Sequence, residues 1–264
     1  MTFLFRRVAV FLSLFFLFSC AKSSSLQKLQ KVAGVSEVRG VLSLDQGQLL
    51  IFGKEPGKTD PIRGDLSRGR VVFIDLPDKM DPGTNTSRMI FDQIGDIISV
   101  SVVSDNDFYV LNKRLVVLEE SKKQASVYQI FHTTNRGASW QVVTVTEPRD
   151  PGEWPHLDFA DDQHGFLADN ENWYRTRDGG KTWTLVKQSL PAGQLKKFVV
   201  LGENSLVYAN DNHLIWADGN LVMQKEVAFE PSFRLVTLYR PGKNSNLVAL
   251  GYDMEKKKHA PIHF

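Results

Sequence analysis

The sequence has one cysteine, almost no net charge and few long apolar runs, and these features exclude some classes of protein. Cys20 is the only cysteine among 264 residues, so no internal disulfide can form. The formal net charge of +2 favours neither the presence nor the absence of a polyanionic partner. No aromatic-basic motif of the usual nucleic-acid binders occurs, and we therefore predict no nucleic-acid partner.

Sustained helical periodicity is also missing beyond the first 19 residues. Short apolar runs alternate instead with turn-forming Gly, Asn and Asp residues, as in residues 97–103, 107–111, 114–119 and 127–132. This pattern predicts an all-β fold. We interpret residues 53–70, rich in Gly, Pro, Asp and Arg, as a long loop that is either a binding loop or a mobile excursion.

The first 19 residues have the features of an export signal. Arg6 and Arg7 precede an apolar stretch of 11 residues, too short for a membrane span, which needs about 20 residues. The end of this stretch, Leu-Phe-Ser before Cys20, resembles the bacterial lipoprotein signal. The resemblance implies cleavage before Cys20, acylation of Cys20 with palmitate-type chains and a membrane anchor, and Ala21 favours the outer membrane, facing the periplasm. The alternative is an ordinary cleaved signal peptide with an incidental cysteine. Residues 20–34 then form a polar tether, and residues 35–264 the folded domain.

One pattern, Thr-x-Asp/Asn-x-Gly-x-Ser/Thr-Trp, occurs at residues 133–140 and again at 176–183. The Asp or Asn suits an Asx-type turn, the Gly allows positive φ, and the Trp buries a large ring. The copies are 43 residues apart, close to the roughly 40–45 residues of a four-stranded propeller blade. Six residues carry the pattern: Asn135, Gly137, Trp140, Asp178, Gly180 and Trp183.

The repeated pattern resembles the Asp-box, or BNR repeat, of sialidase-type propellers and of the photosystem II stability/assembly factor-like family. Residues 156–167 resemble the strand-turn-strand segment that precedes the Asp-box in the latter family. Asp218-Gly219 looks like a degenerate further copy, 40 residues after Asp178. The resemblance implies a β-propeller in which Asp178 staples a turn and is not catalytic. The units counted along this chain give about five four-stranded blades, the first and last of them imperfect.

In such a propeller, ligands usually sit at the face opposite the Asp-box turns. The loops expected there carry a Trp, an Arg and carboxylates, which are common anchors of protein interfaces. We therefore predict a binding patch, with ordinary solvated loops as the alternative, at Arg149, Asp150, Trp154, His156, Asp169 and Asp211.

The predicted function is that of a non-catalytic, membrane-anchored scaffold or assembly factor that binds a protein. Two alternatives stay open: an immunity-type inhibitor of a secreted effector, and a sialidase-like glycoside hydrolase. A sialidase site needs an arginine cluster, a Tyr with a carboxylate and a second carboxylate, and their placement is not recognisable here. We predict no cofactor and no metal, because Pro261 interrupts the His259–His263 pair.

Overall fold

The structure is a computed structural model, and the molecule divides into two units, Met1–Ile97 and Ile98–Phe264, which are described one at a time. Within the described ranges, no helix has the length and apolar character that crossing a bilayer requires. The signal segment and Cys20 lie outside these ranges. The structure describes residues 30–31, 33–44, 48–61, 64–75, 87–147, 155–169, 172–186, 195, 197–210, 213–229, 233–240, 247–256 and 258–261.

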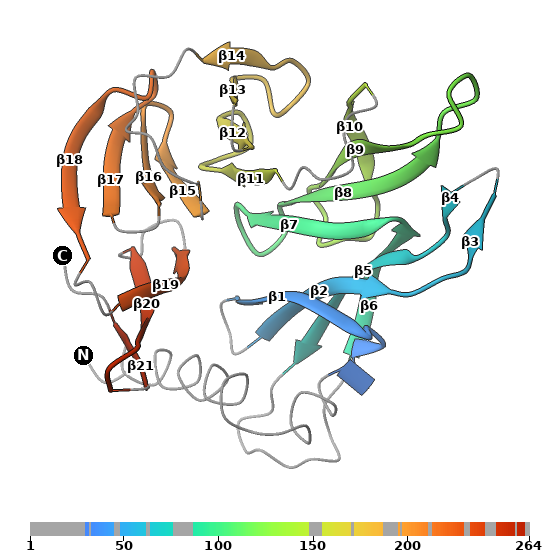
Figure 1. The fold of residues 1–264 in the computed structure, drawn as a ribbon, viewed down its shortest axis with the longest axis horizontal. Coiled ribbons are helices and arrows are strands. Elements are labelled where there is room, and N and C mark those ends of the chain that lie inside the picture. Colours follow the sequence, from blue (N-terminus) through green and yellow to red (C-terminus); the bar gives the residue numbers. More distant parts are fainter. Residues whose placement is uncertain are drawn as a thin grey trace. The chain divides into compact units, whose positions relative to one another are not determined.

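The first unit is built on one antiparallel sheet with the strand order β1-β2-β5-β6 (Figure 1). Its central strands are apolar on both faces, which explains why Leu49, Leu50 and Ile51 are at most 1% exposed. The fourth strand was not anticipated from the sequence. The strands are β1 (Glu37–Ser43), β2 (Gln48–Glu55), β5 (Arg68–Asp75) and β6 (Ser87–Ile94).

The end of the predicted tether is folded onto this sheet. Residues 30, 31 and 33 are helical, and Ala33 and Val35 are 3% and 1% exposed in a core with Leu49 and Ile51. Ala33 belongs to the predicted tether over residues 20–34, and its small apolar side chain covers part of the hydrophobic surface of this sheet.

The predicted long loop over residues 53–70 is also corrected. β2 and β5 pair from Gln48↔Asp75 to Glu55↔Arg68, so most of the flanking residues belong to strands. Beyond that point the chain forms a two-stranded ribbon of β3 (Thr59–Asp60) and β4 (Gly64–Asp65). Gly, Pro and Asp are typical of loops, but here they lie in and beside a short β-hairpin with its own backbone pairing.

The second unit is a series of antiparallel meanders, each with its strands in sequence order. Among its described residues there are three four-stranded sheets and one three-stranded sheet (Figure 1). The strands are β7 (Asp96–Val102), β8 (Phe108–Val117), β9 (Gln124–Thr133) and β10 (Gln141–Val145); β11 (His156–Phe159), β12 (Gly165–Ala168), β13 (Trp173–Thr176) and β14 (Thr184–Val186); β15 (Lys197–Gly202), β16 (Ser205–Ala209), β17 (His213–Asp218) and β18 (Met223–Ala228); and β19 (Phe233–Tyr239), β20 (Val248–Asp253) and β21 (Lys258–Pro261).

Each sheet of the second unit packs its face on the next sheet. Tyr109 of β8 stacks on Phe159 of β11 at 3.6 Å between ring centroids, and Trp173 of β13 lies 4.9 Å from Phe198 of β15. Aromatic pairs of this kind contribute about 0.5–1.5 kcal/mol each beyond the area they bury. With the sheet of the first unit, these sheets confirm the all-β class and a propeller-like fold of about five blades.

One strand differs from the expectation. A turn was predicted at Asn112-Lys113, between strands over residues 107–111 and 114–119, but β8 runs unbroken and pairs with β9 from Phe108↔Thr133 to Val117↔Gln124. Asn112 is 0% exposed and Lys113 is 6% exposed. Turn propensity at this dipeptide is overridden because both residues pair with β9, Asn112 with Gln129 and Lys113 with Tyr128.

Candidate functional site

The turn over residues 176–183 is closed by the side chain of Asp178. Its Oδ1 accepts hydrogen bonds from the Thr182 amide at 2.9 Å and from the Thr176 hydroxyl at 2.8 Å, and its Oδ2 accepts one from the Thr182 hydroxyl at 2.6 Å. The hydrogen bonds from the hydroxyl and amide of Thr182 lower the pKa of Asp178 to about 2. Gly179 and Gly180 have φ of +71° and +86°, as a turn of this kind requires.

The turn over residues 133–140 has the same bonds with an amide in place of the carboxylate. Asn135 Oδ1 accepts from the Ser139 amide at 2.9 Å and from the Thr133 hydroxyl at 2.9 Å, while its Nδ2 donates to the Ser139 hydroxyl at 2.8 Å. Gly137 has φ of 76° and takes the place of Gly180, whereas Arg136 stands at the position of Gly179 with φ of 57°.

A third turn of related geometry follows β17. Asp218 Oδ1 accepts from the amide of Val222, four residues on, at 2.9 Å, as Asp178 does from Thr182. The Gly219 amide donates a hydrogen bond to Asn204 O at 3.1 Å. The Gly179 amide makes the equivalent bond to Gln163 O at 3.0 Å. The degenerate copy expected at Asp218-Gly219 thus keeps the Asx bond without the threonine and tryptophan.

The repeated turns also connect neighbouring sheets. The Thr144 hydroxyl of β10 donates to Gly180 O, and Trp183 Nε1 lies 3.0 Å from both Thr144 Oγ1 and Gly180 O. Arg175 Nη1 of β13 donates to Gly219 O in the following sheet at 2.7 Å. Both carboxylate oxygens of Asp178 accept hydrogen bonds within its own turn, so the role of Asp178 in this geometry is structural.

A different polar cluster lies on the first strands of successive sheets, β7, β11 and β15. Each first strand is the edge of its sheet and has backbone groups that no strand pairs. Side chains from the neighbouring sheet bind them: Ser99 Oγ donates to Leu157 O at 3.0 Å, and the Phe159 amide donates to Ser101 Oγ at 2.9 Å. Serine hydroxyls therefore hold β7 and β11 side by side.

Asp158 is the centre of this cluster. Its Oδ1 accepts from Ser101 Oγ of β7 at 2.7 Å, and its Oδ2 accepts from the Val200 amide of β15 at 2.7 Å, so one carboxylate joins three sheets. Burial raises the pKa of Asp158 to about 6, although hydrogen bonds from Val200 and Ser101 and the charge of Arg240 oppose the rise. A carboxylate that titrates near neutral pH between three strands is an unusual structural element.

Three nitrogen-bearing side chains surround Asp158, and we call the set His156, Asp158, Lys197 and Arg240 the first-strand site. His156 begins β11; crowding by protein atoms and the charge of Lys197 lower its pKa to about 4, so its ring is neutral at pH 7. Lys197 begins β15 and keeps contact with solvent, yet the protein packed around its stem lowers its pKa, against the charge of Asp158. Arg240 follows β19 and donates from Nη1 to Leu201 O at 3.2 Å.

The predicted binding patch is only partly described. Arg149, Asp150, Trp154 and Asp211 lie outside the described residues. His156 belongs to the first-strand site. Asp169 instead closes the turn between β12 and β13, where its Oδ1 accepts from the Asn172 amide at 2.7 Å.

Sequence reasoning did not find Asp158, Lys197 and Arg240 as site residues. The nearby Asp161 closes the turn after β11 and accepts hydrogen bonds from the amides of Gln163 and His164 at 2.9 Å and 2.8 Å. The usable signal was the spacing of His156 and Asp158 by two residues, which places both on one face of a strand.

No protein-family model matches the chain, and no curated protein matches it. Among solved structures, the chain is similar to "YCF48 bound to D1 peptide", with 14% sequence identity, a TM-score of 0.37 and coverage of 81% of this chain and 74% of that chain. A likeness at this level does not show what this chain binds.

Proposed function

We propose that the chain is a non-catalytic lipoprotein of the bacterial envelope, anchored through Cys20, whose propeller-like domain binds a protein partner. The proposal combines the lipoprotein-type signal of the sequence with the first-strand site. The part of the partner that this site suits is an acidic segment or a terminal carboxylate.

The proposal rests on the lack of hydrogen-bond and ion-pair partners of Lys197 and His156 among the described residues. No hydrogen bond or ion pair joins either side chain to another described residue, whereas the neighbouring Asp158 and Arg240 are engaged in bonds between sheets. The charge of Asp158 acts on this ammonium group, but both oxygens of Asp158 already accept other hydrogen bonds, so the ammonium can still bind an incoming carboxylate. Lys197 supplies the charge, and the neutral His156 ring supplies one donor and one acceptor.

The same strands do not suit a glycosidase. A sialidase-type site needs an arginine cluster, a Tyr with a neighbouring carboxylate as nucleophile and a second carboxylate as acid/base, and most other glycosidases need a pair of carboxyl groups. β11, β15 and β19 carry one carboxylate, Asp158, and both of its oxygens already accept hydrogen bonds. No cluster of three side chains suited to a metal ion occurs among the residues that the structure describes, and none enters the proposal.

The test is a pull-down from envelope membranes with the mature, lipidated protein as bait. We expect a stoichiometric protein partner that is lost with Lys197→Met and retained with Lys181→Met, which removes an exposed ammonium from the 176–183 turn. A partner that Lys197→Met leaves unaffected would show that the first-strand site is not the binding surface. Failure to recover any partner, or hydrolysis of a sialoside by the wild type, would overturn the proposed function. The identity of the partner, a membrane-complex subunit or a secreted effector, decides between scaffold and inhibitor.

A further inference from the structure

The first-strand site opens at the end of β11 that is opposite the repeated turn. The turn over residues 176–183 is bonded through the Gly179 amide to the loop that follows β11, so it lies beside the C-terminal end of this strand. His156 and Lys197 instead begin β11 and β15. Asp158 lies two residues further along β11, or about 6–7 Å at the usual rise of a strand. A group that approaches from the open end therefore meets His156 and Lys197 before it meets Asp158.

The side chains of His156 and Asp158 lie on the same face of β11. Ala160, which shares this face by the alternation of a strand, packs into a core with the β15 sheet, whereas Phe159 packs on the β8 sheet. His156 and Asp158 therefore leave β11 on the side of β15, where Lys197 lies. One histidine ring, one carboxylate and one ammonium group thus share a small region between two first strands.

Few charged groups of the described residues face Asp158. β15 contributes Lys197, the end of β19 contributes Arg240, and β11 itself contributes His156. From β7 the group in contact is the Ser101 hydroxyl, and β12 (Gly165–Ala168) has no ionisable side chain. Arg240 is already bonded to the backbone of β15. Lys197 is therefore the cation that remains for a ligand at the open end.

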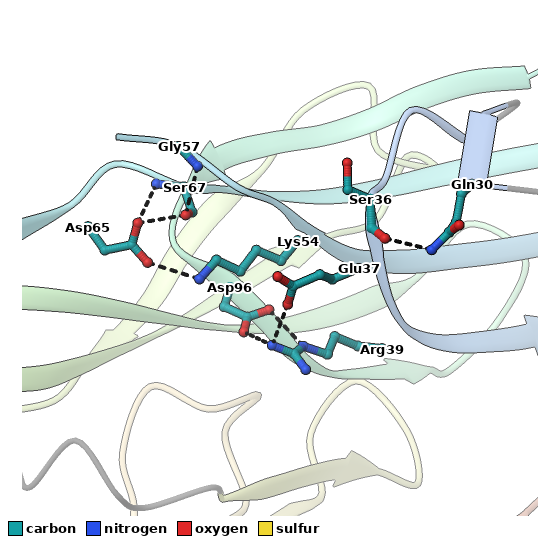
Figure 2. Close-up of polar contacts among 9 residues, drawn as sticks. All are labelled: Gln30, Ser36, Glu37, Arg39, Lys54, Gly57, Asp65, Ser67 and Asp96. Carbon is teal, nitrogen blue, oxygen red and sulfur yellow. Dashed lines mark hydrogen bonds and ion pairs between the residues drawn. The ribbon is translucent and has the colours of Figure 1, made fainter. Parts of the chain in front are cut away.

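A lysine of the first unit shows the contrast with Lys197. Lys54 Nζ lies 3.0 Å from Asp65 Oδ2, so the ammonium and the carboxylate are paired (Figure 2). Lys197 makes no hydrogen bond or ion pair with a described residue, because the oxygens of its neighbour Asp158 are engaged with β7 and β15. Charge-assisted hydrogen bonds are among the strongest that a protein forms, and Lys197 can give one to a carboxylate from outside.

An incoming carboxylate adds a second negative charge beside Asp158. Two carboxylates that share a site do not both stay ionised, because the pKa of one of them is raised strongly. Asp158, with a pKa of about 6, is already protonated in about one molecule in ten at pH 7, whereas His156, with a pKa of about 4, is protonated in about one in a thousand. Asp158 is therefore the group that takes up the proton.

The geometry of Asp158 allows this protonation without loss of its bonds. Each carboxylate oxygen has two lone pairs, and the bonds from Ser101 and from the Val200 amide use one on each oxygen. The added proton can occupy a free lone pair and be donated to the ligand. We propose that the first-strand site binds a carboxylate together with one proton, as a carboxyl–carboxylate pair between Asp158 and the ligand with Lys197 as the counter-ion. This inference rests on the proposed function, because it assigns the partner's carboxylate to the same site.

The test is an NMR titration of the mature, lipidated protein in detergent micelles. The probes are N-acetyl-diglycine, which has a terminal carboxylate, and N-acetyl-aspartamide, which has a side-chain carboxylate; the control is uncharged N-acetyl-diglycinamide. The Val200 amide donates to Asp158 Oδ2 at 2.7 Å, so its resonance reports the protonation of Asp158. We expect a Kd about fifteenfold higher at pH 7.5 than at pH 6, and a midpoint of the Asp158 titration that rises from about 6 to above about 7 with bound probe. The probe that binds more tightly shows which kind of carboxylate the site takes.

Variants assign the effect to its residues. Lys197→Met should weaken binding of the better probe at least tenfold at pH 6, and Lys181→Met, which removes an exposed ammonium elsewhere, should not. Asp158→Asn should make the Kd independent of pH; if this variant does not fold, the wild-type midpoint still decides.

Three results would overturn the inference: equal Kd values at both pH values with an unmoved midpoint, equal binding of the uncharged control, or no binding of either carboxylate probe at pH 6. The pull-down with Lys197→Met tests the proposed function at one pH and without these probes, so the two proposals can fail separately.

Discussion

Substitution by alanine should lower the free energy of unfolding by different amounts at Gly179 and Gly180, two neighbouring glycines of one turn. Both have positive φ, where an L-residue costs about 1–2 kcal/mol. A Cβ on Gly180 would make ordinary contacts, the nearest to Val143 Cγ2 at 3.4 Å. A Cβ on Gly179 would lie 2.7 Å from the backbone oxygen of Asp162, so one of the two segments must move.

The oxygen of Asp162 cannot move freely. It accepts a hydrogen bond from the Tyr109 hydroxyl at 3.1 Å, and the next residue's carbonyl, Gln163 O, accepts from the Gly179 amide at 3.0 Å. Displacement of a packed backbone adds about 1–3 kcal/mol. We therefore expect Gly180→Ala to cost about 1–2 kcal/mol and Gly179→Ala about 2–5 kcal/mol.

Urea unfolding followed by tryptophan fluorescence measures this difference, because Trp183 lies with its ring centroid 6.0 Å from that of Phe159 and reports on the turn. Arg136→Gly is the internal control: Arg136 already has φ of 57° in the equivalent place, so its replacement should change stability by less than about 1 kcal/mol. If Gly179→Ala proves no more costly than Gly180→Ala, the contact with Asp162 does not restrict this turn and the reasoning fails.

Three further predictions concern ionisation and hydrogen bonds. Because burial raises the folded pKa of Asp158 to about 6, above about 4 in the unfolded chain, stability should fall as pH rises from about 4 to 6, and Asp158→Asn should flatten this slope in thermal melts at pH 4, 5 and 7. The pKa of Asp178 is lowered to about 2, so its contribution to stability is present above about pH 4 and is lost as pH falls through 2. Asp178→Ala should therefore lower Tm by about 2–4 °C at pH 7 and by less at pH 2. Asp178→Asn should keep most of the stability, because Asn135 makes the equivalent bonds in its own turn. Thr144→Val should cost about 1 kcal/mol in urea unfolding and no more, because Trp183 Nε1 keeps its bond to a backbone oxygen; a loss above about 3 kcal/mol would contradict this.

Local patterns were sufficient where the deciding interactions are local. The runs at residues 97–103 and 127–132 match β7 and β9 to within three residues at each end, because each is a short apolar or alternating run beside turn residues. The Asx bonds of Asp178 and Asn135 involve residues two to four positions apart, so the motif contains all of their partners. The lipid anchor and the partner remain predictions.

Long-range contacts decided the rest. The sequence by itself determined the all-β class, the repeated turns and the approximate number of blades, since these depend on periodicity and on neighbours along the chain. Only the tertiary structure placed Asp158 between Ser101 and Val200, 57 and 42 residues away. It also joined the 53–70 segment to Ser36 and Gly34 through Glu55 and Arg70. No local pattern reports these pairings, because a side chain that binds the open edge of a neighbouring sheet is selected by packing of the sheets and not by its neighbours in sequence.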